Sequence, residues 1–273
     1  MSKEFIQLTF STAEPVMSEV LIALLSDIGY SGFEESDVAL KAFIDKDHFN
    51  EAEVKRALAG LAVEYNCAEI EEQNWNAQWE SSFDPIIIGN FAAIRAGFHS
   101  PVQQVSHEII ITPKMSFGTG HHATTHMMVE QMADIDFTGK TVIDFGTGTG
   151  VLAILAEKLG AGSVDAIDND DWSIENSEEN MVANGCRQVH VFKADQLPGN
   201  KTYQVILANI NLNVIVDSLP SLARASARGT VVLLSGFLKE DESGLLQLIM
   251  SLNFKHLDTR QKGEWICMKL EMN

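Results

Sequence analysis

The feature that most constrains this fold is a glycine-rich turn, DFGTGTG at residues 144–150, which lies between an apolar run and a helical pattern. Residues 141–145 are predicted as a buried strand, and residues 151–159 as a helix that ends at Gly160. Glycines allow positive φ and let a ligand approach without meeting a Cβ atom. The turn therefore predicts an open α/β sheet whose first strand leads into a ligand-binding loop.

The chain after this turn alternates between strand and helix patterns. Further strands are predicted at residues 163–168, 189–193, 203–208 and 230–235, with helical segments between them. This alternation indicates parallel strands with helices on both faces. A helix at 242–252 then precedes strands at 255–260 and 264–271, which Gln261-Lys262-Gly263 can join as a hairpin. A terminal antiparallel hairpin is typical of methyltransferase sheets and unusual for dinucleotide folds.

The first part of the chain, residues 1–72, has a different pattern. A strand at 5–10, a helix at 15–28, strands near 32–36 and 38–44, a helix at 51–61 and a strand at 63–70 give the order β-α-β-β-α-β. This order predicts a small α+β, ferredoxin-like domain, a fold that assigns no function by itself. Trp75, Trp79 and Phe83 recur every four residues and predict a linker helix at 73–85, which packs against a core or a partner. The main domain then spans 86–273 and begins with two strands, at 86–94 and 105–112.

The charge and the cysteines limit the classes of partner. A formal net charge of −19 disfavours a nucleic-acid substrate and suits a basic partner, although solubility alone is an alternative explanation. The chain has no apolar run of membrane-spanning length and no secretory pattern at its start. Its three sparse cysteines, Cys67, Cys186 and Cys267, are typical of reduced thiols. We expect a cytoplasmic protein that does not bind membranes, and a monomer.

Asp168 ends the second predicted strand of the main domain. A carboxylate there can accept two hydrogen bonds from the ribose diol of an adenosine cofactor. GTGVLA at residues 148–153 also fits a variant of the dinucleotide fingerprint, so an NAD-dependent oxidoreductase is an alternative. The early start of the glycine run, two residues after Asp144, and the terminal hairpin favour S-adenosylmethionine. Asp195 follows the third strand and is either a polar group near adenine or a solvated loop residue.

Several segments carry a specific resemblance. They are FGTGHHATT at 117–125, GKTVIDFGTGTGVLAI at 139–154, Ala208-Asn209-Ile210, and GEW at 263–265, together with the tryptophans and the FDP run of the predicted linker. Over nearly its whole length the chain resembles the ribosomal protein L11 (L-eleven) methyltransferase family. The resemblance implies a seven-stranded, Rossmann-like class I methyltransferase domain, S-adenosyl-L-methionine as cofactor, and a small preceding domain that recognises the substrate. It also implies methylation of amino groups of that large-subunit ribosomal protein, both the N-terminal α-amine and lysine side chains.

The resemblance carries roles for single residues. At the matching positions it implies that Thr125, Gly146, Asp168 and Asn209 contact the cofactor. Residues 169–171, Asn-Asp-Asp where the family often has Ile-Asp-Pro, depart from the pattern beside the ribose. Asn209 is the candidate catalytic residue, because its carbonyl can face the incoming amine.

Four further residues are expected in the cofactor site: Gly148, Asp144, Phe117 and Thr124. Phe117 is expected to pack near the cofactor as part of a lid, and Thr124 and Thr125 to cap a helix start with their hydroxyls. His122 and His126 are four residues apart, but no nearby carboxylate completes a metal site, so no metal is predicted. A methyltransferase of this fold with another substrate, or a non-catalytic module that binds the cofactor, are the remaining alternatives.

Overall fold

The computed structural model describes residues 4–11, 15–30, 32–36, 39–59, 61, 63–71, 84–113 and 118–273. The chain divides into two compact units, Met1–Ser82 and Phe83–Asn273. The predicted linker helix at 73–85, with its two tryptophans and Phe83, lies outside the described residues except for 84 and 85, which are not helical. Phe117 also lies outside them.

The first unit has the order of elements that the ferredoxin-like pattern predicts. It contains β1 (Glu4–Ser11), α1 (Pro15–Ser26), β2 (Gly32–Ser36), β3 (Ala39–Asp45), a short 3-10 helix (Lys46–His48), α2 (Glu51–Ala57) and β4 (Tyr65–Glu71). The strands form an antiparallel sheet in the order β2-β3-β1-β4. Alternate residues such as Leu8 and Leu40 are buried on one face of the sheet, where Leu21 and Leu25 of α1 join them in one core.

The second unit opens with a small three-stranded sheet, β5 (Ile86–Ile88), β6 (Ala92–Ala96) and β7 (His107–Ile111). The prediction of a single strand at 86–94 is wrong, because the chain turns back at Gly89, where φ is +54°, and Ile88 pairs with Ala92. β6 and β7 run parallel. The buried side chain of Arg95 in β6 is paired with Glu108 of β7 at 2.8 Å, which joins the two strands.

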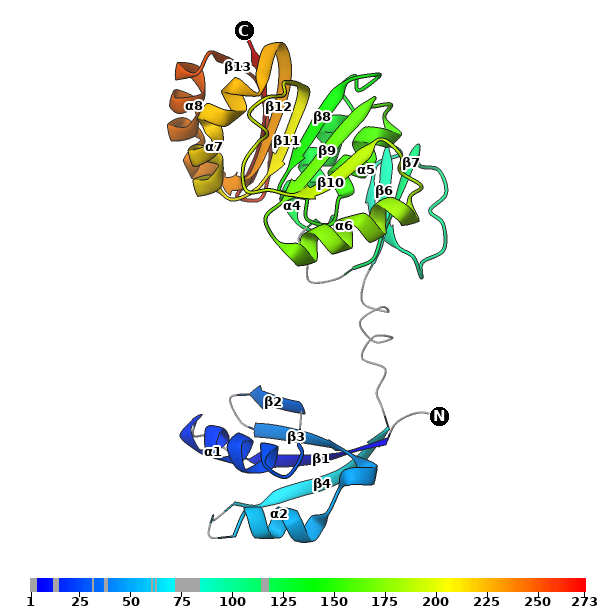
Figure 1. The fold of residues 1–273 in the computed structure, drawn as a ribbon, viewed down its shortest axis with the longest axis vertical. Helices are drawn as coiled ribbons and strands as arrows, with labels where there is room; N and C mark the ends of the chain where they lie inside the picture. The colour runs from blue at the N-terminus through cyan, green and yellow to red at the C-terminus, as the bar shows by residue number, and fades with distance from the viewer. Residues whose placement is uncertain are drawn as a thin grey trace. The chain divides into compact units, whose positions relative to one another are not determined.

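The large sheet follows (Figure 1), and its elements are α4 (Ala123–Met132), β8 (Thr141–Phe145), α5 (Val151–Lys158), β9 (Ser163–Asp168), α6 (Asp171–Ala183), β10 (Val189–Lys193), β11 (Tyr203–Asn209), α7 (Leu212–Arg224), β12 (Ser226–Leu238), a 3-10 turn (Lys239–Asp241), α8 (Glu242–Ser251), β13 (Phe254–Lys262) and β14 (Trp265–Met272). Among the described residues this sheet has seven strands in the order β10-β9-β8-β11-β12-β14-β13. β14 is antiparallel to both neighbours, and the other pairs are parallel. The parallel pairs and the antiparallel hairpin of β13 and β14 are as the sequence predicts.

Two hydrophobic cores cover the two faces of this sheet. Residues of α4 and α5 pack in one core and residues of α7 and α8 in the other. Val142 and Ile143, neighbours in β8, belong to different cores because successive side chains of a strand point to opposite faces. The chain leaves β8 toward β9 on one side and returns to β11 on the other. Such a switch point opens a crevice at the carboxyl ends of the strands.

None of the helices within the described residues is long and apolar enough to cross a membrane.

Candidate active site

The glycine loop, residues 146–150, follows β8 and forms one side of the crevice at the carboxyl ends of the strands. Gly146, Gly148 and Gly150 all have positive φ, at +77°, +54° and +80°. The backbone N–H groups of Gly146 and Thr147 donate to the carbonyl of Ile167 in β9, both at 2.9 Å. The loop is therefore anchored to the neighbouring strand, and its glycine backbone has the conformation that residues with a Cβ rarely adopt.

Asp168, the last residue of β9, faces the glycine loop. Its Oδ2 accepts the backbone N–H of Gly148 at 2.9 Å, and its Oδ1 accepts that of Asp170 at 3.1 Å. Asp170 in turn caps α6 by accepting the backbone N–H of Ser173. Since each carboxylate oxygen can accept more than one hydrogen bond, Asp168 is held in one orientation and can still bind a ligand hydroxyl pair.

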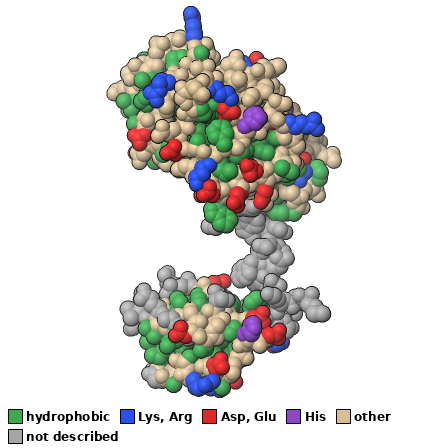
Figure 2. Space-filling model, in the orientation of Figure 1, with side chains coloured by type: hydrophobic (Ala, Val, Ile, Leu, Met, Phe, Trp, Pro, Cys, Tyr) green, Lys and Arg blue, Asp and Glu red, His purple; other side chains and the backbone are tan. Residues whose placement is uncertain are grey.

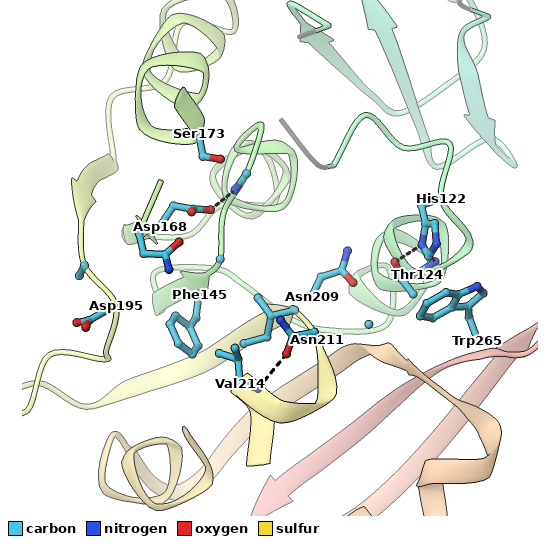
Figure 3. Close-up of a pocket in the computed structure, with 16 residues that line it drawn as sticks. His122, Thr124, Phe145, Asp168, Ser173, Asp195, Asn209, Asn211, Val214 and Trp265 are labelled. Carbon is cyan, nitrogen blue, oxygen red and sulfur yellow. Dashed lines mark hydrogen bonds between the residues drawn. The ribbon is translucent and has the colours of Figure 1, made fainter. Parts of the chain in front are cut away.

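A cavity of about 460 Å³ lies between the ends of these strands. It is lined by His122, Thr124, Phe145, Gly146, Gly148, Asp168, Asn169, Ser173, Ala194, Asp195, Asn209, Ile210, Asn211, Val214, Gly236 and Trp265. Figure 3 shows Asp168, Ser173 and Asp195 at one end and His122, Thr124 and Trp265 at the other, with Asn209 between them. The two ends of the cavity therefore carry different side chains, with carboxylates and a hydroxyl at one end and aromatic rings at the other.

Asn209 ends β11 and is only 8% exposed. Its Nδ2 donates to the hydroxyl of Thr125 at 3.2 Å. Its Oδ1 is buried and has no hydrogen-bond partner among the described residues. A buried acceptor without a partner is costly, typically about 1–3 kcal/mol, so this oxygen is suited to a ligand that brings an N–H donor.

His122 and Trp265 form the other end of the cavity. His122 is the N-cap of α4, and its Nδ1 accepts the backbone N–H of Thr124 at 3.3 Å and contacts the Thr124 hydroxyl at 2.7 Å. The prediction that Thr124 and Thr125 cap this helix is wrong, because both lie inside its first turn. The rings of His122 and Trp265 meet edge to face, with centroids 4.6 Å apart.

Asp144 lies beneath the glycine loop and does not line the cavity. Its Oδ2 accepts a hydrogen bond from the hydroxyl of Thr147 at 2.7 Å, while its Oδ1 has no hydrogen-bond partner among the described residues. Complete burial raises the pKa of Asp144 to about 7, and the nearby charge of Asp168 adds to the increase. In this structure Asp144 supports the loop from inside.

Ile210 is held between two glycines. A Cβ at Gly146 would lie 2.2 Å from Cγ2 of Ile210, and a Cβ at Gly236 would lie 2.1 Å from its carbonyl oxygen. The N–H of Ile210 donates to the carbonyl of Ser235 in β12 at 3.1 Å. Glycine at both positions therefore lets the residue after Asn209 sit tightly against the glycine loop and β12.

The structure brings most of the expected site residues together. Thr124, Gly146, Gly148, Asp168 and Asn209 line the cavity, and so does Asp195, whose role the sequence leaves open. Thr125 is buried beside it and bonds to Asn209. The sequence reasoning gave no site role to His122, Ser173, Val214, Gly236 and Trp265, and it placed Asn169 only in the loop beside the ribose.

Some of these had a signal in the sequence. A histidine just before a helix start is a possible cap, and GEW at 263–265 was already part of the resemblance. Gly236 lies near the end of β12, directly after the strand predicted at 230–235, and the sequence gave it no role in the site.

The fold and the cavity define a class I methyltransferase. The family model described as "Ribosomal protein L11 methyltransferase (PrmA)" matches residues 14–273. The chain belongs to this family.

Individual relatives agree with the family match. The ribosomal protein L11 methyltransferase of Phocaeicola vulgatus is 36% identical, over 98% of this chain and 99% of the relative. That of Chlorobaculum parvum is 38% identical, over 93% and 92%. The crystal structure of the ribosomal protein L11 methylase from Lactobacillus delbrueckii subsp. bulgaricus is similar with a TM-score of 0.65 at 28% identity, covering 70% of this chain and all of that one.

Proposed function

We propose that this protein transfers methyl groups from S-adenosyl-L-methionine to amino groups of ribosomal protein L11. Family membership supports the enzyme class over the NAD-dependent alternative. The observation that carries the chemistry is the buried Oδ1 of Asn209, which lacks a partner among the described residues and lies between the two ends of the cavity. An amine nitrogen that approaches the cavity can donate an N–H to this oxygen.

The residues at the Asp168 end fit an adenosyl cofactor. The orientation of Asp168 is fixed by two backbone N–H groups, and this leaves lone pairs for the two ribose hydroxyls. Phe145 and Val214 add apolar surface to the same cavity, and Asp195 adds a polar group. Gly146 and Gly148 of the glycine loop line the cavity with backbone, so a ligand can approach the loop without meeting a side chain there. When bound there, S-adenosyl-L-methionine supplies an activated methyl group on a sulfonium.

We propose that Thr125 acts through Asn209. The Thr125 hydroxyl accepts a hydrogen bond from Nδ2 of Asn209, and this bond restrains the amide. The Asn209 oxygen is thereby kept facing the cavity, where it orients the lone pair of a bound amine toward the methyl group. Holding two reacting groups in line contributes about 7–11 kcal/mol in well-oriented reactions.

The amine must lose its proton before it attacks. An ordinary lysine with a pKa near 10.4 costs about 4.6 kcal/mol to deprotonate at pH 7, whereas an α-amine near 7.8 costs about 1 kcal/mol. The α-amine is therefore the easier substrate. For a lysine, the apolar surface of Trp265 at the far end of the cavity favours the neutral amine by removing water.

The surface charge supports a basic protein as the partner. Acidic side chains gather over α6, which begins beside the cavity (Figure 2). The exposed ones on this helix are Asp171, Glu175, Glu178 and Glu179. Such a surface attracts lysine-rich segments and repels phosphate. We accordingly propose that the enzyme acts on the protein and not on RNA, as a monomer in the cytoplasm.

Mass spectrometry of recombinant L11 after incubation with the enzyme and cofactor tests the proposal. We expect methyl groups on the N-terminal α-amine and on lysines of L11, as membership of this family implies. Each methyl group replaces one hydrogen and adds about 14 Da to the mass. If the enzyme binds S-adenosylhomocysteine but leaves L11 unmodified, the proposal that L11 is its substrate is rejected. Stabilisation against heat by NADH but not by S-adenosylhomocysteine would reject the enzyme class.

The role of Asn209 is tested separately. Asn209→Ala removes the amide oxygen, and we expect it to retain most S-adenosylhomocysteine binding while its single-turnover rate falls by about 100-fold, the scale of a misplaced reacting group. Thr125→Val is the matched variant, because it removes the acceptor of the Nδ2 proton and leaves the amide in place; we expect a smaller loss. An unchanged rate in Asn209→Ala would remove Asn209 from the mechanism.

A further inference from the structure

Three asparagines are spaced one turn apart along α6: Asn176 and Asn180 lie within the helix, and Asn184 is its C-cap. Residues four apart share one face of a helix. Asparagine is a poor residue for a helix interior, because its amide competes with the backbone for hydrogen bonds. Asn176 and Asn180 are nonetheless fully buried. Their position calls for specific partners.

Asn184 binds the edge of the small sheet. Its Oδ1 accepts the N–H of Ile110 at 3.0 Å, and its Nδ2 donates to the carbonyl of the same residue at 2.6 Å. β7 is an edge strand, with β6 on its other side. The amide of Asn184 therefore takes the place of a neighbouring strand for one residue of β7.

Asn180 connects two different segments. Its Oδ1 accepts the N–H of Thr112, just after β7, at 2.7 Å. Its Nδ2 donates to the carbonyl of Thr149, in the glycine loop, at 2.8 Å. A single buried amide thus uses its acceptor on one segment and its donor on the other.

Thr149 makes a second connection of the same kind. Its hydroxyl donates to the carbonyl of Gly118 at 2.7 Å. Gly118 lies shortly before α4, which begins with the cavity residues His122 and Thr124. The glycine loop is consequently bonded to Thr112 through Asn180 and to Gly118 directly, and both segments are held at fixed positions against it.

We propose that Asn180 is a positioning residue, which sets the glycine loop against the segment that leads into α4 and thereby sets the affinity for the cofactor. The inference rests on the proposed function, because it takes S-adenosyl-L-methionine as the ligand of that loop. Asn180 does not line the cavity and acts through the backbone of Thr149. Gly148, the preceding residue, lines the cavity and donates to Asp168, so a shift of Thr149 changes the ribose site.

Asn180→Ala and Asn180→Asp test this role. The aspartate keeps an acceptor for Thr112 but replaces the donor with a second oxygen, which faces the Thr149 carbonyl. Asn184→Ala is the matched control, since it removes two hydrogen bonds to β7 and one to the backbone carbonyl of Asn180, and Asn184 has no hydrogen bond to the glycine loop among those of the described residues. The readouts are the dissociation constant of S-adenosylhomocysteine by calorimetry, the KM for S-adenosyl-L-methionine, kcat and Tm.

We expect Asn180→Ala to weaken S-adenosylhomocysteine binding roughly tenfold, about 1.4 kcal/mol, with a larger effect on KM than on kcat. Asn180→Asp should weaken binding at least as much. Asn184→Ala should lower Tm to a similar extent and leave the dissociation constant within about twofold, a change below 0.5 kcal/mol. Equal dissociation constants for Asn180→Ala and Asn184→Ala would overturn the inference.

A second pair of variants covers the case in which the Asn180 variants do not fold. Thr149→Ser keeps the hydroxyl that bonds Gly118, and Thr149→Val replaces it with a methyl group of similar size. We expect weaker S-adenosylhomocysteine binding for the valine variant only, and equal binding by the two would overturn the inference. If the unaltered enzyme does not bind S-adenosylhomocysteine, both the proposed function and this inference are wrong. If it binds and the variants bind equally well, only this inference is wrong.

Discussion

Gly236 offers the sharpest test of how the site is built, because its environment excludes any side chain. Its φ is +104°, and an added Cβ would lie 2.1 Å from the carbonyl oxygen and 2.7 Å from the carbonyl carbon of Ile210. The strand register shifts between Ser235 and Phe237, so Gly236 forms an irregularity in β12 beside β14. The atoms in the way belong to backbone, which cannot move aside as a side-chain end does.

The cost of Gly236→Ala has two parts. A residue with a Cβ at such a φ costs about 1–3 kcal/mol. Relief of the overlap requires the Ile210 carbonyl to retreat from 2.1 Å to an ordinary contact of 3.4 Å or more, and forced repacking of this kind costs about 1–3 kcal/mol more. We expect a total near 4 kcal/mol, which lowers Tm by roughly 8–16 °C in a unit of this size. Because Asn209 precedes Ile210, displacement by about 1 Å should also slow methyl transfer about 100-fold.

Gly229→Ala is the matched control in the same strand. Gly229 has a φ of +84°, and nothing lies within 4 Å of its added Cβ, so this variant carries the backbone strain without the overlap. Thermal unfolding and single-turnover transfer to L11 are measured on both variants. The reasoning is refuted if the two have the same Tm and the same rate, since the contact with Ile210 would then have no consequence.

Two further predictions follow from buried contacts of the same site. Burial raises the pKa of Asp144 from 3.8 to about 7. Between pH 3.8 and about 7, the carboxyl group is therefore protonated in the folded state and ionised in the unfolded state. The free energy of unfolding consequently falls by up to about 1.4 kcal/mol per pH unit as the pH rises through this window. Asp144→Asn should flatten the dependence of unfolding free energy on pH from 5 to 7 relative to the unaltered protein, and parallel curves would contradict the assignment. Gly146→Ala should weaken S-adenosylhomocysteine binding because its Cβ would meet Cγ2 of Ile210 at 2.2 Å; adding Ile210→Ala should restore part of the affinity, and strictly additive losses would show that the overlap is not the cause.

Local patterns in the sequence are sufficient for the order of elements and for the site at the strand ends. Residues 141–145 and 163–168 agree with β8 and β9 without adjustment. Asp168 was predicted to end the strand at 163–168 and Asn209 to follow the strand at 203–208, and the carboxyl ends of parallel strands meet at one edge of the sheet. The cofactor contact of Asn209 was implied by the family resemblance and stays a prediction.

Other contacts of the site depend on pairings between distant segments. The turn within residues 86–94 was marked locally by Gly89-Asn90, a pair typical of hairpin turns, and the single-strand prediction overlooked it. The parallel pairing of β6 with β7, by contrast, joins segments that no local pattern connects. Trp265 reaches the cavity only because β14 inserts next to β12, with Leu238 opposite Trp265. His122 and Trp265, which form one wall, are far apart in the chain.

The sequence by itself determined the fold class and the glycine loop, because short-range periodicity and turn chemistry encode these features. The family resemblance came from the quoted motifs, and it implied the role of Asn209. Only the tertiary structure decided that Asp144 is buried beneath the loop, that Gly236 and Gly146 enclose Ile210, and that Asn180 bonds both Thr112 and Thr149. The physical reason is that burial, close approach and the partner of a polar group are properties of pairs of segments, and no single segment specifies them.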